Sequence, residues 1–228
     1  MFLINESWDR VLNISVLQEK LQIVDEKRKI EKILPLSAEN SDILLALKLT
    51  NFDDVKVLII GQDPYPNEED AHGLAFSKKS GDFPDSLRNI FNKIKDEYGI
   101  ENKNGNLTSW AKQGVLLLNR ALTFSQNESL AKRNTFWRPV INDILQQLIS
   151  RRKPLVIMLW GNPANQLFVE SDSYYLKNNI LVLRSSHPSM LGYKKETVFG
   201  SFYNCKHFSL CNKFLKANDI KEIDWQTY

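Results

Sequence analysis

Four short apolar runs restrict the folds open to this chain more than any other feature of its sequence. They are Val55 to Ile60, Gly114 to Leu118, Leu155 to Trp160 and Ile180 to Leu183. Each is rich in leucine and β-branched residues, which is typical of a strand that is buried on both faces. The chain is therefore expected to build its core around four such strands.

Segments with helical spacing lie between these runs. They are Ser86 to Tyr98, Thr135 to Ile149 and Pro163 to Phe168, with Ser86 as a predicted N-cap and Gly99 as a predicted C-terminal stop. Strands that alternate with helices indicate a parallel sheet. We therefore predict an α/β fold with a central four-stranded parallel sheet flanked by helices.

Further amphipathic helices are predicted at Trp8 to Leu21, Ser41 to Leu49 and Cys205 to Leu215. The chain has 228 residues, of which 43% are hydrophobic, and this is enough for one well-buried core but short for two. It contains no repeat, low-complexity tract or Pro/Gly linker. A single domain over residues 1–228 is expected, with residues 1–50 forming a helical segment packed on it.

The charge of the chain is compatible with a nucleic-acid partner but does not require one. The formal net charge is +3, and many enzymes have a similar value. From Arg184 to Lys216 there are six basic residues and one acid, Glu196. Charge alone leaves two interpretations open, a solvated face or a surface that binds phosphates.

Cysteine and histidine usage predicts neither a metal nor a nucleotide cofactor. The two cysteines, Cys205 and Cys211, would face different sides of a helix, the three histidines lack zinc spacing, and no Gly-rich phosphate loop occurs. The chain begins without a basic, apolar leader and contains no apolar run of membrane-spanning length. A soluble protein is expected, in the cytoplasm or, in a eukaryotic or viral host, in the nucleus.

Polar residues follow the predicted strands where each one ends. Gly61-Gln62-Asp63-Pro64-Tyr65 follows the first strand, Asn119 the second, Gly161-Asn162 the third and the Ser185 to Ser189 segment with His187 the fourth. Taken singly, these residues are typical of turns, caps and loops. Since ligands bind outside the carboxyl ends of parallel strands, their convergence indicates an active site.

The order and spacing of these segments resemble those of uracil-DNA glycosylases of family 1, the uracil-N-glycosylase type. The resemblance extends from about Val55 to Asn212. The segments that carry it are Gly61–Tyr65, Ala71–Ser77, Pro84–Phe91, Gly114–Asn119, Leu159–Ala164, His187–Leu191 and Lys206–Ser209. Together these ordered motifs are far more specific than a lone Asp-Pro-Tyr.

The resemblance implies a monofunctional DNA repair hydrolase that needs no metal or other cofactor. Such an enzyme flips uracil out of DNA, hydrolyses its N-glycosidic bond and leaves an abasic site. Uracil-containing DNA, single- or double-stranded, is then the substrate, and the protein is expected to act as a monomer. A uracil-DNA glycosylase inhibitor protein or a replication factor would be a further partner.

The resemblance also implies a role for each matching residue in catalysis. Asp63 would stabilise the sugar cation and orient the attacking water, and a neutral His187 would donate a hydrogen bond to O2 of the uracil anion. The backbone N–H of Gln62 would support the same anion. One carboxylate is sufficient because the uracil anion is a better leaving group than the sugar oxygen of an O-glycoside.

Three further residues are expected to recognise the base. Uracil would stack on Phe76 and pair with the side-chain amide of Asn119, which can donate to O4 and accept from N3–H. Cytosine has the opposite pattern of donors and acceptors. Tyr65 would stand against C5 and exclude the methyl group of thymine.

The remaining matches are implied to contact DNA. Leu191 would fill the space that the flipped base leaves, and the others would position the backbone. The full set comprises Ser86, Gly161, Asn162, Ser189, Leu191, Lys194 and Lys195. The last two lie in a loop that is longer than is usual in the family.

This chain departs from the family pattern at several positions, none of which removes a predicted catalytic group. Pro66 stands where histidine is usual, and Met190 and Gly192 replace a proline and a serine. Ala131-Lys132 replaces a Ser-His pair, and Glu68-Glu69-Asp70 places three acids in a loop that is usually near neutral. We expect altered DNA affinity and salt dependence.

Three alternative functions fit the sequence less well. A mismatch-selective relative would commonly carry asparagine at Asp63 and lack Tyr65. A non-catalytic DNA-binding subunit would not need Asp63, Asn119 and His187 together. A nucleoside hydrolase would not need Leu191 or the basic segment.

Overall fold

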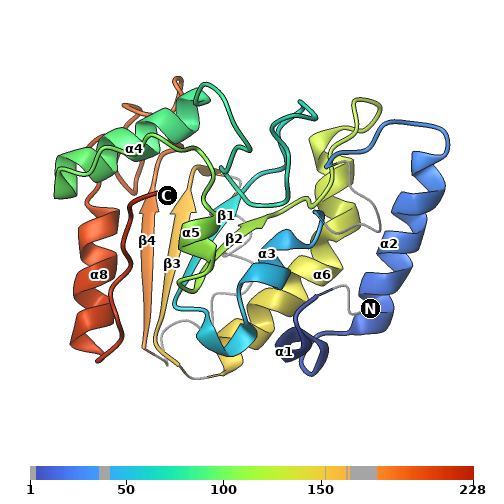
Figure 1. Ribbon diagram of the computed structural model, residues 1–228, viewed down its shortest axis with the longest axis horizontal. Helices are drawn as coiled ribbons and strands as arrows, with labels where there is room; N and C mark the ends of the chain where they lie inside the picture. Colours follow the sequence, from blue (N-terminus) through green and yellow to red (C-terminus); the bar gives the residue numbers. More distant parts are fainter. Residues whose placement is uncertain (1–3, 36–41, 152, 163, 165–178) are drawn as a thin grey trace.

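The computed structural model describes the chain except for residues 1–3, 36–41, 152, 163 and 165–178. At its centre is a sheet of four parallel strands in the order β2-β1-β3-β4 (Figure 1). The strands are β1 (Val57–Gly61), β2 (Val115–Asn119), β3 (Leu155–Trp160) and β4 (Ile180–Ser185). The predicted four-stranded parallel sheet is confirmed. Only its first, second and fourth strands have shifted bounds.

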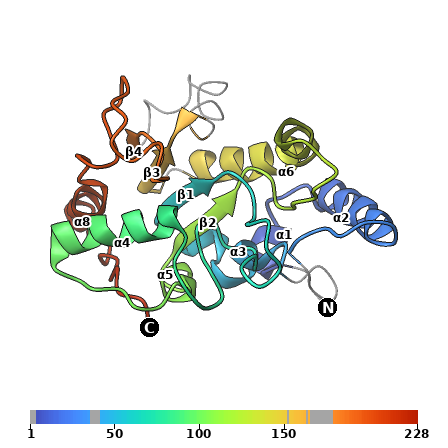
Figure 2. The same cartoon turned by 90° about the horizontal axis from the view of Figure 1, so that it is seen from above.

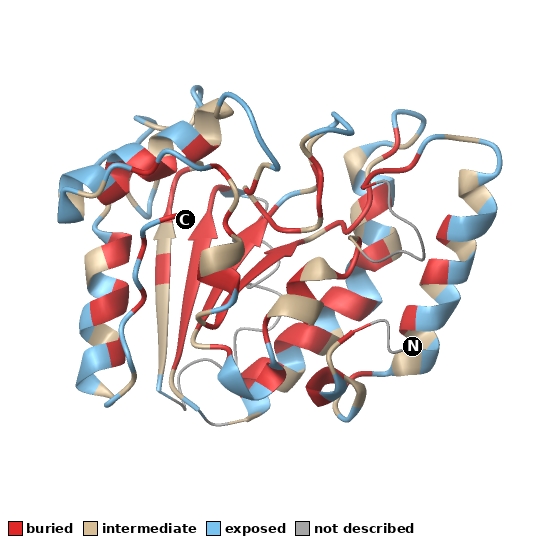
Figure 3. Cartoon of the chain, viewed as in Figure 1, coloured by how far each residue is buried: buried red, intermediate tan, exposed pale blue. Residues whose placement is uncertain are grey.

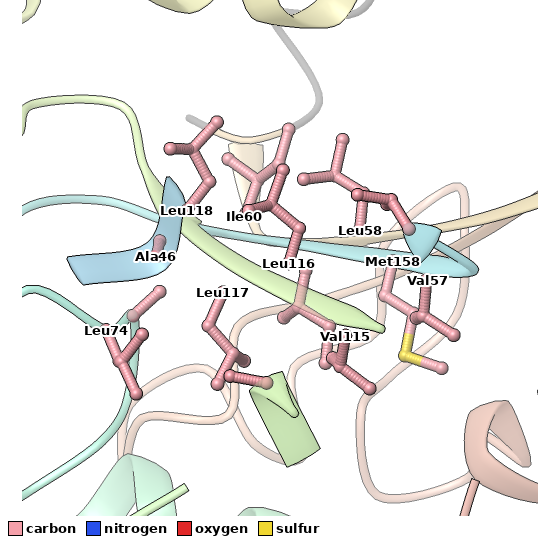
Figure 4. Packing of buried hydrophobic residues seen from close by; sticks show 14 of the residues in the cluster. Ala46, Val57, Leu58, Ile60, Leu74, Val115, Leu116, Leu117, Leu118 and Met158 are labelled. Carbon is pink, nitrogen blue, oxygen red and sulfur yellow. The ribbon is translucent and has the colours of Figure 1, made fainter. Parts of the chain in front are cut away.

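Strands β1, β2 and β3 are apolar over almost their whole length because both faces of this part of the sheet are covered. All residues of β1, β2 and β3 are buried. Figure 4 shows Leu58, Ile60 and Leu118 on one side of the sheet, and Val115 and Leu117 on the other. This alternation puts successive apolar side chains into two separate layers of core, as the pleat requires. Figure 3 shows β1, β2 and β3 as buried, whereas β4 at the edge of the sheet is largely intermediate.

Helices cover both faces. They are α1 (Glu6–Asp9), α2 (Ile14–Arg28), α3 (Leu45–Leu49), α4 (Asp85–Tyr98), α5 (Thr108–Ala111), α6 (Leu130–Ser150) and α8 (His207–Ala217), with a short 3-10 turn at Phe52–Asp54. Figure 2 shows α6 on one face of the sheet and α3 and α5 on the other. The sheet therefore lies between two helical layers, as expected for a parallel sheet.

The N-terminal helical prediction is wrong in one respect. A single helix was expected from Trp8 to Leu21, but the chain forms α1 and α2 with a break between them. The side chain of Asn13 accepts a hydrogen bond from the backbone N–H of Val16 at 3.3 Å, so Asn13 is the N-cap of α2. Asparagine is a strong N-cap residue, and this local signal separates the two helices.

Other helix boundaries also moved. Ser86 is not an N-cap, because α4 already begins at Asp85 after Pro84. Gly99, with φ +72°, ends α4 as predicted. The α6 helix begins before Thr135 because the side chain of Ser129 caps it. The expected helix at Pro163 to Phe168 lies outside the described residues.

The C-terminal helix begins later than predicted. Cys205 precedes α8, which starts at His207, and Cys211 is buried within the helix. Both cysteines are free thiols. Among the residues that the structure describes, no helix is both long enough and apolar enough to cross a bilayer.

Candidate active site

A pocket of about 180 Å³ opens at the carboxyl ends of the strands. This volume is below the roughly 300–1,000 Å³ typical of pockets for drug-sized ligands, so it suits a single small group. Its lining comes from the loop after β1, the segment around Phe76, the end of β2 and the loop after β4. The lining residues include Gln62, Asp63, Tyr65, His72, Phe76, Ser86, Asn119 and His187.

Strand order explains why these residues meet. The chain passes from β1 to β2 on one side and then returns to β3 on the other side of β1. The carboxyl ends of β1 and β3 thus flank a topological switch point, where open parallel sheets bind ligands. Six of the predicted catalytic and base-binding residues, Asp63, His187, Gln62, Tyr65, Phe76 and Asn119, are brought to this one pocket.

The position of the Asn119 side chain depends on the glycine beside it on the neighbouring strand. Gly61 and Asn119 are partners in the β1–β2 register. A Cβ atom on Gly61 would lie 2.2 Å from Oδ1 of Asn119 and 2.8 Å from Cβ of Ala75. Glycine at position 61 therefore makes room for the amide of Asn119, which is 5% exposed at the pocket.

Phe76 forms one wall of the pocket in a strained conformation. Its φ is +61°, which is uncommon for a residue with a large side chain. The hydroxyl of Tyr65 donates to the carbonyl of Phe76 at 3.1 Å and ties the two residues together. The Phe76 ring lies 5.9 Å from the ring of His187 and 5.4 Å from that of Trp160, centroid to centroid.

His187 is held as a neutral ring with a defined tautomer. Burial lowers the pKa of its imidazole below the usual value. The backbone N–H of Ser189 donates to Nδ1 at 3.0 Å, so the proton of the neutral ring is on Nε2. A Cβ atom on Gly161 would lie 2.9 Å from Cβ of His187. The loop after β3 can therefore approach His187 this closely only because residue 161 is a glycine.

Asp63 makes an ion pair that the sequence did not predict. Its Oδ2 accepts from Nη2 of Arg133 at 2.6 Å, and its Oδ1 accepts from Nε2 of Gln62 at 3.2 Å. Arg133 lies in the first turn of α6. A cation in the first turn of a helix is unfavourable because the helix dipole is positive at that end. The position of Arg133 was therefore the one local signal in the sequence that an anion lies nearby.

Of the residues predicted to bind DNA, only Ser86 is among those that line the pocket, and several of the others are exposed on the loops that follow β3 and β4. Leu191 is 92% exposed, and Lys194, Lys195 and Asn162 are also exposed. Ser86 lies in the first turn of α4, at the pocket itself. The loop before Leu191 is anchored from the same helix, because Nδ2 of Asn89 donates to the carbonyl of Pro188 at 2.7 Å.

The structure explains why residue 192 is a glycine. A Cβ atom at this position would lie 2.4 Å from the carbonyl oxygen of His187. The backbone N–H of Gly192 donates to the carbonyl of Ser189, which closes the loop tightly. The serine usual in the family would force this turn apart.

Two of the three residues in the acidic run Glu68-Glu69-Asp70 are paired within the protein. Glu68 forms an ion pair with Lys32 at 2.5 Å, and Asp70 one with Lys78 at 3.2 Å. The second pair is largely covered, with 15% and 14% of its side chains exposed. Local charge on this loop is therefore lower than the sequence indicates.

The remaining polar groups of the pocket are neutral or paired. Burial lowers the pKa of His72 to about 4, and its Nε2 is 2.7 Å from Oγ of Ser77. Within the described part of the chain, no three His, Cys, Asp or Glu side chains are grouped closely enough to hold a metal ion. The arrangement offers one carboxylate, one amide and one neutral imidazole around a small pocket.

Comparisons with known proteins agree with this geometry. The model of the Uracil DNA glycosylase superfamily matches residues 47–216. A uracil-DNA glycosylase of Fusobacterium nucleatum is 37% identical over 231 residues, covering 98% of this chain and 96% of the relative. Uracil-DNA glycosylase 2 of Listeria innocua is 37% identical over 232 residues, covering 99% and 98%. A mimivirus UNG variant, solved in complex with UGI, superposes with a TM-score of 0.85 at 25% identity, covering 99% of this chain and 90% of that one.

Proposed function

Since the chain belongs to the uracil DNA glycosylase superfamily, we propose that the pocket between Asp63 and His187 is where it removes uracil from DNA. The enzyme hydrolyses the N-glycosidic bond of uracil, releases the free base and leaves an abasic site. The bond is out of reach inside a duplex, so the nucleotide is flipped out before cleavage. A pocket sized for one base suits that step.

His187 stabilises the departing uracil. Cleavage leaves negative charge on the base, and a preorganised donor at that charge lowers the barrier. The observation that carries this role is the hydrogen bond from the N–H of Ser189 to Nδ1 of His187, which leaves Nε2–H as the donor of the ring. Burial, which lowers the pKa of His187, favours the same neutral form.

Asp63 acts on the other half of the charge separation. The sugar becomes cationic as the bond breaks, and a carboxylate stabilises that cation and orients the attacking water. Glycosidases that cleave O-glycosides use two carboxylates, one of which protonates the leaving oxygen. Uracil leaves as an anion held by His187, so Asp63 alone is sufficient.

Base selection depends on three residues. Asn119 presents a donor and an acceptor to the edge of uracil, and Gly61 keeps the space for that amide open. Phe76 supplies the stacking surface. Tyr65, fixed by its hydrogen bond to the Phe76 carbonyl, stands where the methyl group of thymine would lie.

Uracil release from defined oligonucleotides tests this function against its alternatives. The protein is incubated with single-stranded uracil DNA, U:A and U:G duplexes, a T:G duplex and free deoxyuridine. We expect uracil release from the first three and no reaction of the last two. Activity confined to mismatches would indicate a mismatch-selective enzyme, cleavage of deoxyuridine a nucleoside hydrolase, and binding without release a non-catalytic subunit.

We further propose that the DNA-binding face also accepts a protein inhibitor of this class of enzyme. Support comes from the mimivirus UNG variant, whose structure was solved in complex with UGI. The exposed Leu191 offers such a partner an apolar projection. Titration with UGI should abolish uracil release at a 1:1 ratio, and full activity in excess UGI would refute the proposal. Action as a monomer and an intracellular location stay predictions.

A further inference from the structure

The Arg133–Asp63 pair is short and covered by protein. Nη2 of Arg133 is 2.6 Å from Oδ2 of Asp63, and only 7% and 14% of the two side chains are exposed. Salt screens such a pair much less than it screens charges at the surface. The carboxylate that the proposed reaction uses is therefore held by a cation at a fixed place.

The guanidinium of Arg133 is itself fixed from other directions. Nη1 donates to the carbonyl of Ser125 at 3.0 Å and to the carbonyl of Glu128. The guanidinium carbon also lies 4.6 Å from the centre of the Phe124 ring. Because guanidinium is a planar, rigid fork, these contacts together set the direction in which Nη2 points. Arg133 can therefore determine the orientation of Asp63.

The two contacts of Asp63 differ in how firmly they can hold it. Gln62, which donates to Oδ1, is an exposed neutral side chain. Arg133 is buried and charged, and hydrogen bonds between charged groups are the stronger kind. Pro66, three residues after Asp63, has no backbone N–H and no polar side chain to offer. The firm contact therefore comes from α6, which is distant in the sequence.

We propose that Arg133 is a positioning residue for uracil release. Arg133 fixes the rotamer of Asp63. The carboxylate lone pairs that do not bind Arg133 are then left for the attacking water and the sugar cation. The inference rests on the proposed role of Asp63. Arg133 does not touch the base or the sugar in this scheme, and it acts only through that carboxylate.

A double-mutant cycle tests the proposal. Arg133→Met, Asp63→Asn and the double variant are compared under single-turnover conditions on a single-stranded uracil oligonucleotide. Arg133→Met should lower the rate about ten- to a hundred-fold, the size of loss known for residues that orient the ligands of a catalytic metal by hydrogen bonds. The concentration of enzyme that gives half the maximal rate should change little. In the Asp63→Asn background the same substitution should cost nothing further.

Two controls separate positioning from other effects. Arg138→Met removes an exposed charge from the same helix and should leave the rate unchanged, which excludes a simple change in attraction to DNA. Arg133→Lys keeps a cation and should recover part of the lost rate. If Arg133→Met does not fold, Arg133→Lys takes its place in the cycle and should still lower the rate only when Asp63 is present.

The outcomes distinguish a failure of the positioning role of Arg133 from a failure of the proposed role of Asp63. An unchanged or faster rate in folded Arg133→Met refutes positioning. An equal loss with and without Asp63 does so too, because it shows that Arg133 supports the α6 turn rather than the carboxylate. A normal rate in Asp63→Asn would instead refute the role of Asp63, on which the inference depends.

Discussion

The hydrogen bond from the Ser189 N–H to Nδ1 of His187 requires a neutral ring, so this contact is connected with the pH dependence of stability and activity. Its pKa in the folded protein is lowered by burial, so the unfolded chain, with a histidine pKa of about 6.5, takes up a proton first as the pH falls. Burial of His187 therefore costs stability below about pH 6.5 and nothing above it. Protonation also removes the acceptor for the N–H of Ser189.

We predict that the single-turnover rate stays constant as the pH falls from 8 through 6.5 and drops only at lower pH. The reason is that the neutral, Nε2-protonated ring persists below the ordinary pKa of histidine. A pH–rate profile of the wild type, beside that of His187→Gln, measures this. A drop centred at or above pH 6.5 that disappears in His187→Gln would contradict the tautomer assignment.

Tyr65 combines two functions that substitution can separate. Tyr65→Ala opens space at C5 and removes the hydrogen bond to the Phe76 carbonyl, so we expect measurable thymine release and slower uracil release. Tyr65→Phe keeps the ring and loses only the hydroxyl. It should slow uracil release modestly and still reject thymine. Thymine release by Tyr65→Phe, or its absence in Tyr65→Ala opposite a mismatch, would refute the steric role.

At the scale of elements, the loop after β4 exposes Leu191 to solvent. The start of this loop is held by α4, because the side chain of Asn89 donates a hydrogen bond to the carbonyl of Pro188. We predict that Leu191→Ala slows uracil release from duplex DNA by about ten-fold or more, because the vacated base stack is no longer filled. Single-stranded DNA has no such stack and should be affected less. Rates on matched single- and double-stranded substrates measure the difference.

Val198 supplies the matched control for Leu191. It is equally exposed, at 93%, in the same long loop, but beyond the His187–Leu191 segment. Val198→Ala should change neither rate. Equal losses in both variants would mean that the whole loop, rather than Leu191, carries the effect.

The strands, and the gathering of polar residues at their carboxyl ends, were predictable because their signals are local. Apolar runs such as Leu155–Trp160, and polar residues at their ends, can be read directly, and parallel pairing then brings the ends together. The Arg133–Asp63 contact joins residues 70 positions apart, and no periodicity encodes it. The start of α6 was missed for a different reason, because the helix begins directly after the cap residue Ser129 and the apolar spacing used to predict it begins later.

The whole molecule carries little net charge, so its attraction to DNA depends on where the charges lie. The acidic residues Glu68 and Asp70 are paired with lysines, so they should repel DNA phosphates less than the sequence alone indicates. Lys194 and Lys195 stay exposed, and Lys194 lies 5.2 Å from the centre of the Tyr203 ring. They are the stronger candidates for setting salt dependence.

We predict that replacing Lys194 and Lys195 with glutamine weakens duplex binding and flattens its salt slope by up to about 0.9 per lost phosphate contact. Binding measured between low and moderate salt gives the slope. The matched control replaces Lys112 and Lys221, two exposed lysines near the starts of β2 and β1, at the amino ends of the strands and away from the pocket at their carboxyl ends. An equal effect in both variants would show that only net charge matters.

The central claim is that Asp63 and His187 act on charge that exists only near the transition state. Single-turnover uracil release by Asp63→Asn and His187→Gln, measured beside DNA binding, tests it most directly. The account predicts rates lower by orders of magnitude, with the fold and the affinity for DNA nearly intact. A variant that binds DNA normally and releases uracil at the wild-type rate would contradict it.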